Sequence, residues 1–199
     1  MDSTDYTDYL PEILPKVKGC PEPAAVNAVR NALIELCRRA PVWRYEHDPL
    51  SSMANEGVYD FEPPPGAEVV QVLQAWYDGV PLTPATEDEL HVVYADFRTV
   101  DGTPKYYTQD DETAVILVPR PSAAVVDAIK MVVQLKPTIA STSADSRLYN
   151  RYREQVAHGA LARLYDMDGE TWANADKADR NLTLFENDIV TASSMAQRN

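Results

Sequence analysis

The 199-residue sequence has few glycines, two cysteines and no long apolar run, and each shortage argues against a class of function. Seven glycines leave little material for a nucleotide-binding loop, and no G-x-S-x-G or H-E-x-x-H pattern occurs. Cys20 and Cys37 are too few for a zinc site or a disulfide scaffold, which favours a reduced, cytosolic setting. The longest apolar run, AVILV at residues 114–118, is far shorter than the roughly 20 residues that cross a bilayer, so we expect no membrane partner.

Basic residues are also scarce, with 18 Lys and Arg against 31 Asp and Glu and a net charge of −13. This balance disfavours nucleic-acid binding, which draws its affinity from Lys and Arg on phosphates. The charge is uneven, because residues 78–112 carry a net −7 and residues 136–163 a net +3. Blocks of opposite sign favour attraction between copies of the chain, although scattered solvated faces explain the pattern about as well.

No pattern predicts catalysis, a metal site or a cofactor. His47, His91 and His158 are isolated from further metal ligands, and we expect them to be surface or structural residues. The acidic stretches TEDEL and QDDET lack the alternating spacing of a calcium loop, so we expect solubilising turns. A carboxylate-based, metal-dependent hydrolase stays open as an alternative of another class. Four aromatic residues lie in or next to the acidic residues 78–112, and we expect them to pack a sheet face or a protein interface: Trp76, Tyr77, Tyr106 and Tyr107.

The N-terminal part predicts an arm followed by a helix. Residues 1–20 are acidic and show little periodicity, so we expect an arm that is flexible or ordered only against a neighbour. Residues 21–41 predict a helix, because Pro23 suits a first turn and Pro41 a stop. Its apolar residues form one stripe: Val26, Val29, Leu33, Leu36 and Cys37.

Residues 42–137 change to short apolar runs separated by Pro, Gly and Asp, which is typical of strands. Asp78-Gly79 predicts a hairpin turn, and an acidic turn divides KYYTQDDETAVILV. Thr86 is placed to cap one short helix within TEDELHVVYADF. Pro63, Pro64 and Pro65 predict a corner outside any sheet. The region is therefore expected to be a small, mostly antiparallel β lobe.

Helical spacing returns after residue 138. One apolar row has strict four-residue steps (Leu148, Tyr152, Val156, Ala160 and Leu164), and a second has alternating three- and four-residue steps (Ala175, Ala178, Leu182, Phe185, Ile189 and Ala192). Asp168-Gly169 sets the bend of this helical hairpin, and Gly159 predicts a close backbone neighbour. We therefore predict an α+β fold: an arm (1–20), a bundle of three main helices (21–41 and 138–199, with a C-terminal tail) and an inserted β lobe (42–137).

The order of four segments carries a family resemblance. AVNAVRNALIELCRRAPVWR is followed by VVQVLQAWYDGVPLTPATEDEL, by VILVPRP, and by YREQVAHGALARLYDMDGETWAN with the later LFENDI. This order closely resembles the head-to-tail adaptor, or connector, proteins of tailed bacteriophages over roughly residues 20–192. The segment from Gly159 to Trp172 is its most recognisable part.

The resemblance implies a structural virion protein at the head–tail junction, assembled in the host cytoplasm. About twelve copies would form a ring on the portal and extend the DNA channel. Genomic double-stranded DNA would pass through this channel without specific binding. The ring would also offer a docking surface to a tail, nozzle or tail-tube protein. The alternative is that the chain forms a neighbouring ring of the tail, as a tail terminator or a nozzle subunit. No catalytic residue, metal or cofactor is implied.

Two sets of contact residues follow as expectations. The C-terminal segment is polar and suited to ordering on a partner, so portal contact is assigned to Ile189, Val190, Met195, Gln197, Arg198 and Asn199. A closed ring needs two complementary patches on each subunit, and these are assigned to Arg147, Arg151 and Arg153 and to Asp110, Asp111 and Glu112.

Overall fold

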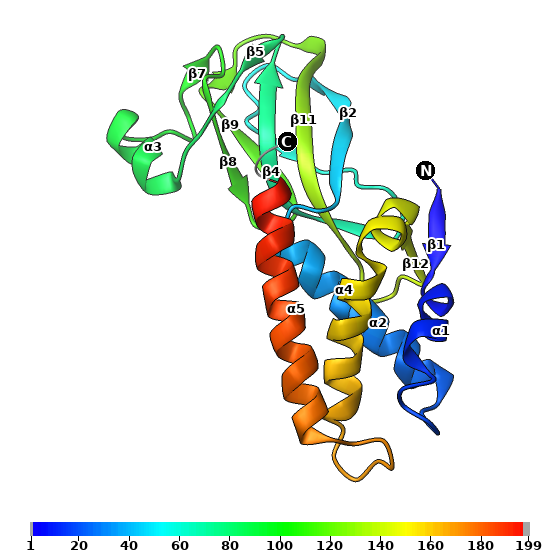
Figure 1. The fold of residues 1–199 in the computed structure, drawn as a ribbon. Helices are drawn as coiled ribbons and strands as arrows, with labels where there is room; N and C mark the ends of the chain where they lie inside the picture. Colours follow the sequence, from blue (N-terminus) through cyan, green and yellow to red (C-terminus); the bar gives the residue numbers. More distant parts are fainter. Residues whose placement is uncertain (1, 197–199) are drawn as a thin grey trace. The chain divides into compact units, whose positions relative to one another are not determined.

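The computed structural model describes residues 2–196 and divides into two compact units. Unit 1 holds the residues up to Trp43, Pro65–Glu68 and the residues from Lys136 onward, and unit 2 holds Arg44–Pro64 and Val69–Leu135. Helices dominate unit 1 and mostly antiparallel strands fill unit 2, which confirms the predicted α+β fold (Figure 1). That the bundle and the lobe are separate folding domains stays a prediction.

Three long helices form the body of unit 1: α2 (Glu22–Arg39), α4 (Ser146–Tyr165) and α5 (Ala175–Ala196). Helix α4 packs against both α2 and α5. The four-residue row predicted for α4 is buried throughout, because these residues form the stripe that faces the other helices. Asp145 caps α4, its carboxylate accepting the backbone N–H of Arg147 at 2.8 Å.

The row predicted for α5 is only partly buried. Ala178, Phe185, Ile189 and Ala192 are at most 6% exposed, but Leu182 is 47% exposed and Ala175 also lies at the surface. The three-and-four spacing therefore identified the four buried residues of α5 but also assigned the exposed Ala175 and Leu182 to the same face.

The N-terminal residues are not an arm, which corrects the prediction for residues 1–20. They form β1 (Ser3–Asp5), the 3₁₀ turn η1 (Tyr6–Tyr9) and α1 (Leu10–Ile13), and β1 pairs antiparallel with β12 (Ser143–Asp145). Tyr6, Ile13 and Val17 are fully buried in unit 1. Their packing against the helices fixes a segment whose composition alone suggested mobility.

Unit 2 is built around two four-stranded sheets. The first has the order β2 (Arg44–Ser52), β11 (Val125–Pro137), β4 (Ala67–Tyr77) and β5 (Val80–Pro81). The second has the order β3 (Val58–Asp60), β9 (Ala114–Val118), β8 (Tyr106–Asp110) and β6 (Thr83–Pro84). The pairs β2–β11, β4–β5, β3–β9 and β8–β9 are antiparallel, whereas β6–β8 and the short pair β7 (Asp101–Gly102) with β10 (Arg120–Pro121) are parallel.

The predicted turns largely agree with the structure. Asp78 and Gly79 have φ values of 48° and 77°, which suits the tight hairpin between β4 and β5. Thr86 caps the short helix α3 (Glu87–Val93) as expected. Asp101-Gly102 forms the short strand β7, and β2 continues to Ser52 because its residues Leu50 and Ser52 pair with β11.

One glutamine joins the two sheets of unit 2. The Gln109 side chain on β8 accepts the N–H of Val72 at 2.9 Å and donates to the carbonyl of Val70 at 3.1 Å. Both backbone groups belong to β4, beyond the short stretch that β5 pairs. Gln109 therefore supplies hydrogen-bond partners to part of the unpaired edge of β4. Without such partners, an open edge can pair with a strand of another chain.

Candidate interaction surfaces

The described residues 2–196 contain no group of three or more His, Cys, Asp or Glu side chains that could hold a metal ion. His47 is buried, and both ring nitrogens contact the backbone: Nδ1 lies 2.7 Å from the Asp48 carbonyl, and Nε2 accepts the Glu62 N–H at 2.8 Å. His158 Nδ1 lies 2.9 Å from Asp188 Oδ2 and joins α4 to α5. Both histidines therefore have structural roles. Within the same described range, no helix combines the length and apolar character that spanning a membrane requires.

At Gly159, side chains from both other long helices lie directly against the backbone of α4. A Cβ at this position would lie 2.9 Å from two ring carbons of Phe185 on α5 and 3.0 Å from the Ala32 Cβ on α2. Gly159 thus has close neighbours, but they are side-chain atoms and not the backbone neighbour that the glycine predicted. The absence of a side chain lets both helices approach α4 at one level.

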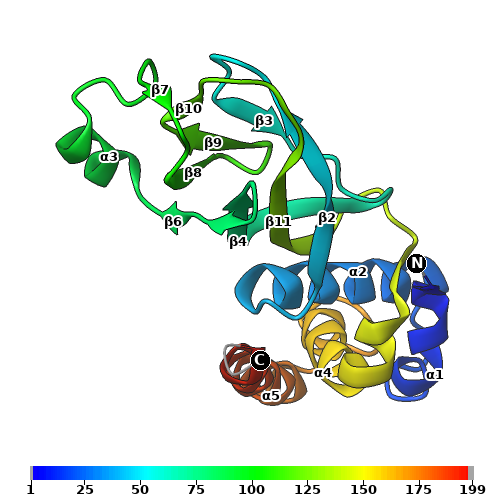
Figure 2. The ribbon, with the colours of Figure 1, turned by 90° about the horizontal axis from the view of Figure 1, so that it is seen from above.

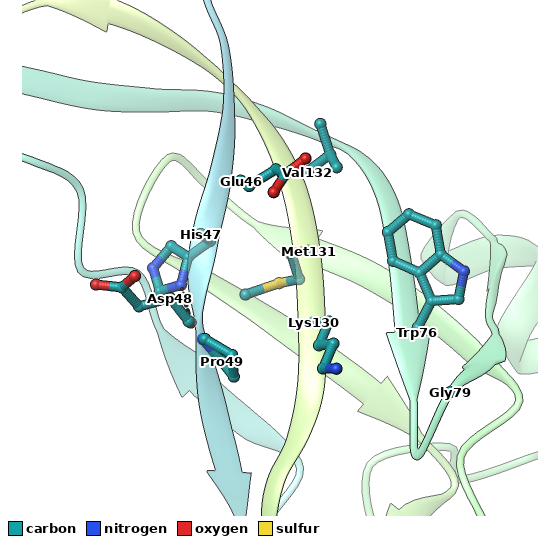
Figure 3. Close-up of a pocket in the computed structure, with 9 residues that line it drawn as sticks. All are labelled: Glu46, His47, Asp48, Pro49, Trp76, Gly79, Lys130, Met131 and Val132. Atoms are coloured by element: carbon teal, nitrogen blue, oxygen red, sulfur yellow. Dashed lines mark hydrogen bonds between the residues drawn. The ribbon is translucent and has the colours of Figure 1, made fainter. Parts of the chain in front are cut away.

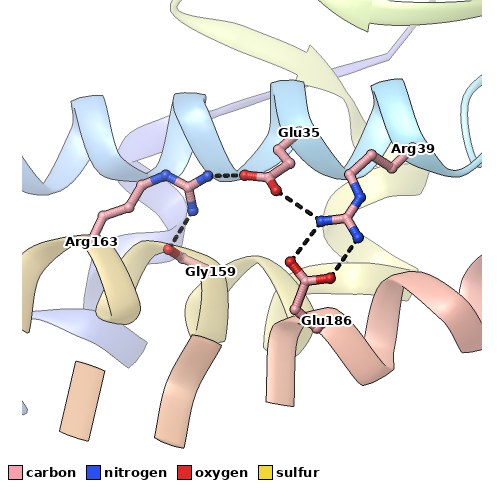
Figure 4. Close-up of polar contacts among 5 residues, drawn as sticks. All are labelled: Glu35, Arg39, Gly159, Arg163 and Glu186. Carbon is pink, nitrogen blue, oxygen red and sulfur yellow. Dashed lines mark hydrogen bonds and ion pairs between the residues drawn. The ribbon is translucent and has the colours of Figure 1, made fainter. Parts of the chain in front are cut away.

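Ion pairs surround this contact and join all three helices (Figure 4). Arg39 on α2 donates to Glu35 at 3.0 Å and, through two nitrogens, to Glu186 on α5 at 2.7 and 2.5 Å. Arg163 on α4 donates to Glu35 and to the Gly159 carbonyl, the latter at 2.7 Å. The hydrogen bonds from Arg39 lower the pKa of Glu186 below the ordinary glutamate value. Sequence reasoning missed this network, although the four-residue spacing of Glu35 and Arg39 is a recognisable signal.

Two of the three predicted interface arginines already have carboxylate partners. Arg147 Nη2 lies 2.6 Å from Asp145 Oδ2, and Arg153 Nε lies 3.2 Å from Glu12 Oε1. Arg151 is exposed, and its guanidinium carbon lies 5.5 Å from the centroid of the Tyr152 ring. Among the described residues 2–196, Arg151 has no carboxylate within ion-pair distance. All three arginines lie on α4, and of these three only Arg151 is left for a new ionic contact.

The predicted acidic set lies at one hairpin of unit 2. Asp110 ends β8, and Asp111 and Glu112 form the exposed turn before β9, with Asp111 at a φ of 52°. The acids belong to unit 2 and the arginines to unit 1. Their pairing between copies stays a prediction.

The predicted portal-contact residues have different exposures. Helix α5 continues to Ala196, so much of the expected tail is already helical. Val190 is 63% and Met195 49% exposed, whereas Ile189 is 3% exposed and packs inside unit 1. The remaining predicted residues, Gln197, Arg198 and Asn199, lie outside the described residues.

The two units differ strongly in charge. Unit 2 contains fifteen acidic residues and five basic ones, a net charge of −10, whereas unit 1 contains sixteen acidic and thirteen basic residues, a net charge of −3. Most of the negative charge of the chain is therefore concentrated in the β-rich unit. This potential repels phosphates and attracts basic surfaces.

Unit 2 also carries a hollow of about 550 Å³ on its first sheet (Figure 3). We call it the Trp76 hollow, and it is lined by Glu46, His47, Asp48 and Pro49 of β2, by Trp76 and Gly79 of the β4–β5 hairpin, and by Lys130, Met131 and Val132 of β11. Trp76 is half-buried, Lys130 is exposed, and Met131 closes the floor at 2% exposure. The expected role of Trp76 in a sheet face or an interface is compatible with this position.

Comparison with known proteins gives one family. The family described as SU10 adaptor protein matches residues 4–199, and a search of curated proteins finds none that matches. The family is one of bacteriophage head-to-tail adaptors, which are structural proteins and not enzymes, and which associate with portal and tail components of the virion. Because the match covers nearly the whole sequence, the chain belongs to the SU10 adaptor protein family.

Proposed function

We propose that about twelve copies of this protein assemble on the portal into a ring that extends the DNA channel and provides the attachment surface for the tail. The observation that carries the proposal is the family match over residues 4–199. Assembly takes place in the host cytoplasm, and the finished ring is part of the virion. The protein acts through surfaces, without a cofactor.

The portal contact involves the exposed side and the end of α5. Val190 and Met195 are the exposed apolar residues of this stretch, and Gln197, Arg198 and Asn199 follow them. Burial of these side chains against a portal would add apolar contact at the end of a preformed helix. Ile189 is buried inside unit 1, so it would reach a partner only if α5 left the bundle.

One contact between neighbouring copies pairs Arg151 with the acidic turn of Asp110, Asp111 and Glu112. Support comes from the exposure of Arg151 and from its lack of a carboxylate among residues 2–196. Arg147 and Arg153 flank this contact but would have to share their present partners, Asp145 and Glu12. A heterologous contact of this kind closes a ring when the rotation between copies is right.

The negative charge of unit 2 suits a passage for DNA. About twelve copies, each with a net −10 on this unit, would surround the duplex with repulsive potential, so that DNA moves without adhering. This predicts that Lys substitutions at lumen-facing acids slow or block genome ejection while leaving particles assembled. Normal ejection by such particles would contradict this part of the proposal.

Electron microscopy of the purified protein mixed with portal rings tests the proposal. We expect a second ring stacked on the portal, and its loss in the variant Arg151→Glu but not in the matched variant Arg180→Glu, which changes another exposed arginine. Restoration by Arg151→Glu combined with Asp111→Lys would assign the contact. A ring that copurifies only with tail components would instead favour a tail terminator or nozzle subunit.

A further inference from the structure

Helix α3 (Glu87–Val93) is a firmly held projection of unit 2 (Figure 2). A capping box fixes its start, because the Glu89 N–H donates to Thr86 Oγ1 at 3.3 Å and the Thr86 N–H donates to Glu89 Oε2 at 2.8 Å. Leu90 is fully buried and packs in a small core with Phe97 and with Ile116 and Val118 of β9. These contacts hold α3 in shape without a partner.

The outer end of this helix is apolar and uncovered. Val92 is 88% and Val93 53% exposed, and we call these two residues the α3 tip. Water contact with two adjacent valines on a well-fixed projection is unfavourable, and removing that contact favours association. Asp88 lies four residues before Val92 and Glu89 four before Val93, so two carboxylates neighbour the tip on the surface of α3. Glu89 is held by the Thr86 cap, and Asp88 is the carboxylate that the cap does not use.

The Trp76 hollow offers the complementary features. Trp76 and Val132 give it apolar walls. Lys130 supplies an exposed ammonium group with no carboxylate in ion-pair distance among residues 2–196. Glu46 and Asp48 line the side formed by β2 (Figure 3). An incoming carboxylate is therefore repelled on the β2 side and attracted to Lys130, which orients the contact.

The two features lie at opposite ends of unit 2. In Figures 1 and 2, α3 lies at one end of this unit, beyond β8 and β9, and β2 and β11 lie at the other. A projection at one end and a matching hollow at the other make a head-to-tail contact that each copy gives once and receives once. The same geometry keeps the tip from filling the hollow of its own chain.

We propose that the α3 tip of one copy inserts into the Trp76 hollow of the next copy, with Val92 against Trp76 and Asp88 paired to Lys130. The contact rests on the proposed function, because it is one of the contacts that close the adaptor ring. It is weak by itself and becomes effective when the portal brings copies together, because tethering raises the effective concentration of the second site.

Substitutions in the α3 tip and in the Trp76 hollow test the contact, and the number of complete rings on portals is the measurement. We expect Val92→Asp and Lys130→Glu each to reduce complete rings on portals by about tenfold or more, the effect of losing one apolar or ionic contact at each junction. The exchange of charges, Asp88→Lys together with Lys130→Glu, should restore the rings that Asp88→Lys alone and Lys130→Glu alone both lose. The matched control Val126→Asp changes another exposed valine, 79% exposed, on β11 and should leave rings unchanged.

Cross-linking identifies the partner directly. In a Cys20→Ser background, the pair Asp88→Cys and Lys130→Cys should give a ladder of covalent multimers from portal-bound rings under oxidation, whereas each single cysteine variant should give dimers at most. Complete rings formed equally by Val92→Asp, Lys130→Glu and the unchanged protein would overturn the contact and leave the proposed function standing. Failure of the unchanged protein to form any ring on portals would overturn both.

Discussion

The substitution Gly159→Ala tests the packing of the helical bundle most sharply, because two effects of opposite sign act at one position. Alanine in a helix interior is more favourable than glycine by about 1 kcal/mol. The new Cβ, however, would lie 2.9 Å from two Phe185 ring carbons and 3.0 Å from the Ala32 Cβ, where carbon atoms prefer about 3.5–4.0 Å. Phe185 and Ala32 are both fully buried, so neither can move into solvent.

The magnitude follows from these two terms. Overpacking a full core costs about 1–3 kcal/mol, which exceeds the gain in helix propensity. We therefore expect Gly159→Ala to lower the free energy of unfolding by about 1 kcal/mol net, measured by denaturant titration with circular dichroism. In a Phe185→Leu background the ring is gone, so the same substitution should become neutral or stabilising, a coupling of about 1–2 kcal/mol. A stabilising effect in the unchanged background would refute the close packing described for Gly159.

Three further outcomes follow from contacts in unit 1. Glu186→Gln should cost less than about 1 kcal/mol at neutral pH, because the Arg39–Glu186 pair is well exposed. Since the folded pKa of Glu186 is lowered, its ionised form stabilises the protein above the ordinary glutamate pKa, and this stabilisation is lost as pH falls. The difference in free energy of unfolding between Glu186→Gln and the unchanged protein should therefore vanish between about pH 5 and pH 3. A difference that stays constant with pH in denaturant titrations would contradict this. Asp145→Ala should cost about 1–2 kcal/mol through loss of the α4 cap, and Asp145→Asn much less; equal losses in thermal unfolding would count against the capping role. Tyr6→Ala should lower the free energy of unfolding by about 3–5 kcal/mol because the ring of Tyr6 is fully buried. An unchanged melting temperature would indicate that the N-terminal residues are a flexible arm after all.

Sequence periodicity identified the elements whose partners are other helices. The α4 row from Leu148 to Leu164 is buried because four-residue steps define one face whatever lies against it. The turn at Asp78-Gly79 and the cap at Thr86 were also predictable, since both depend on residues adjacent in the chain.

The N-terminal segment was mispredicted for a physical reason. Tyr6, Tyr9, Leu10, Ile13 and Val17 follow three- and four-residue steps, but the segment is short and contains two prolines, so its periodicity is weak. Its order depends on distant groups: β1 pairs with β12, and the Tyr6 hydroxyl lies 2.7 Å from Ser141 Oγ. A local pattern contains no information about a partner 135 positions away.

The contact surfaces were the least predictable part. Arg147, Arg151 and Arg153 all lie on α4, but only the fold reveals that Arg153 already pairs with Glu12. The exposure of Val92 was likewise hidden, because a valine in a predicted helix is normally counted as core. Ionic partners and solvent exposure depend on the packing of distant segments, which composition and spacing do not specify.

Cryo-electron microscopy of phage particles assembled with and without this protein is the most direct test of its role. The account predicts that particles with the protein carry a ring of its copies between portal and tail, and that particles without it contain DNA-filled heads whose portals bear no tail. Particles that lack the protein and still join heads to tails would contradict the assignment of this chain as the head-to-tail adaptor.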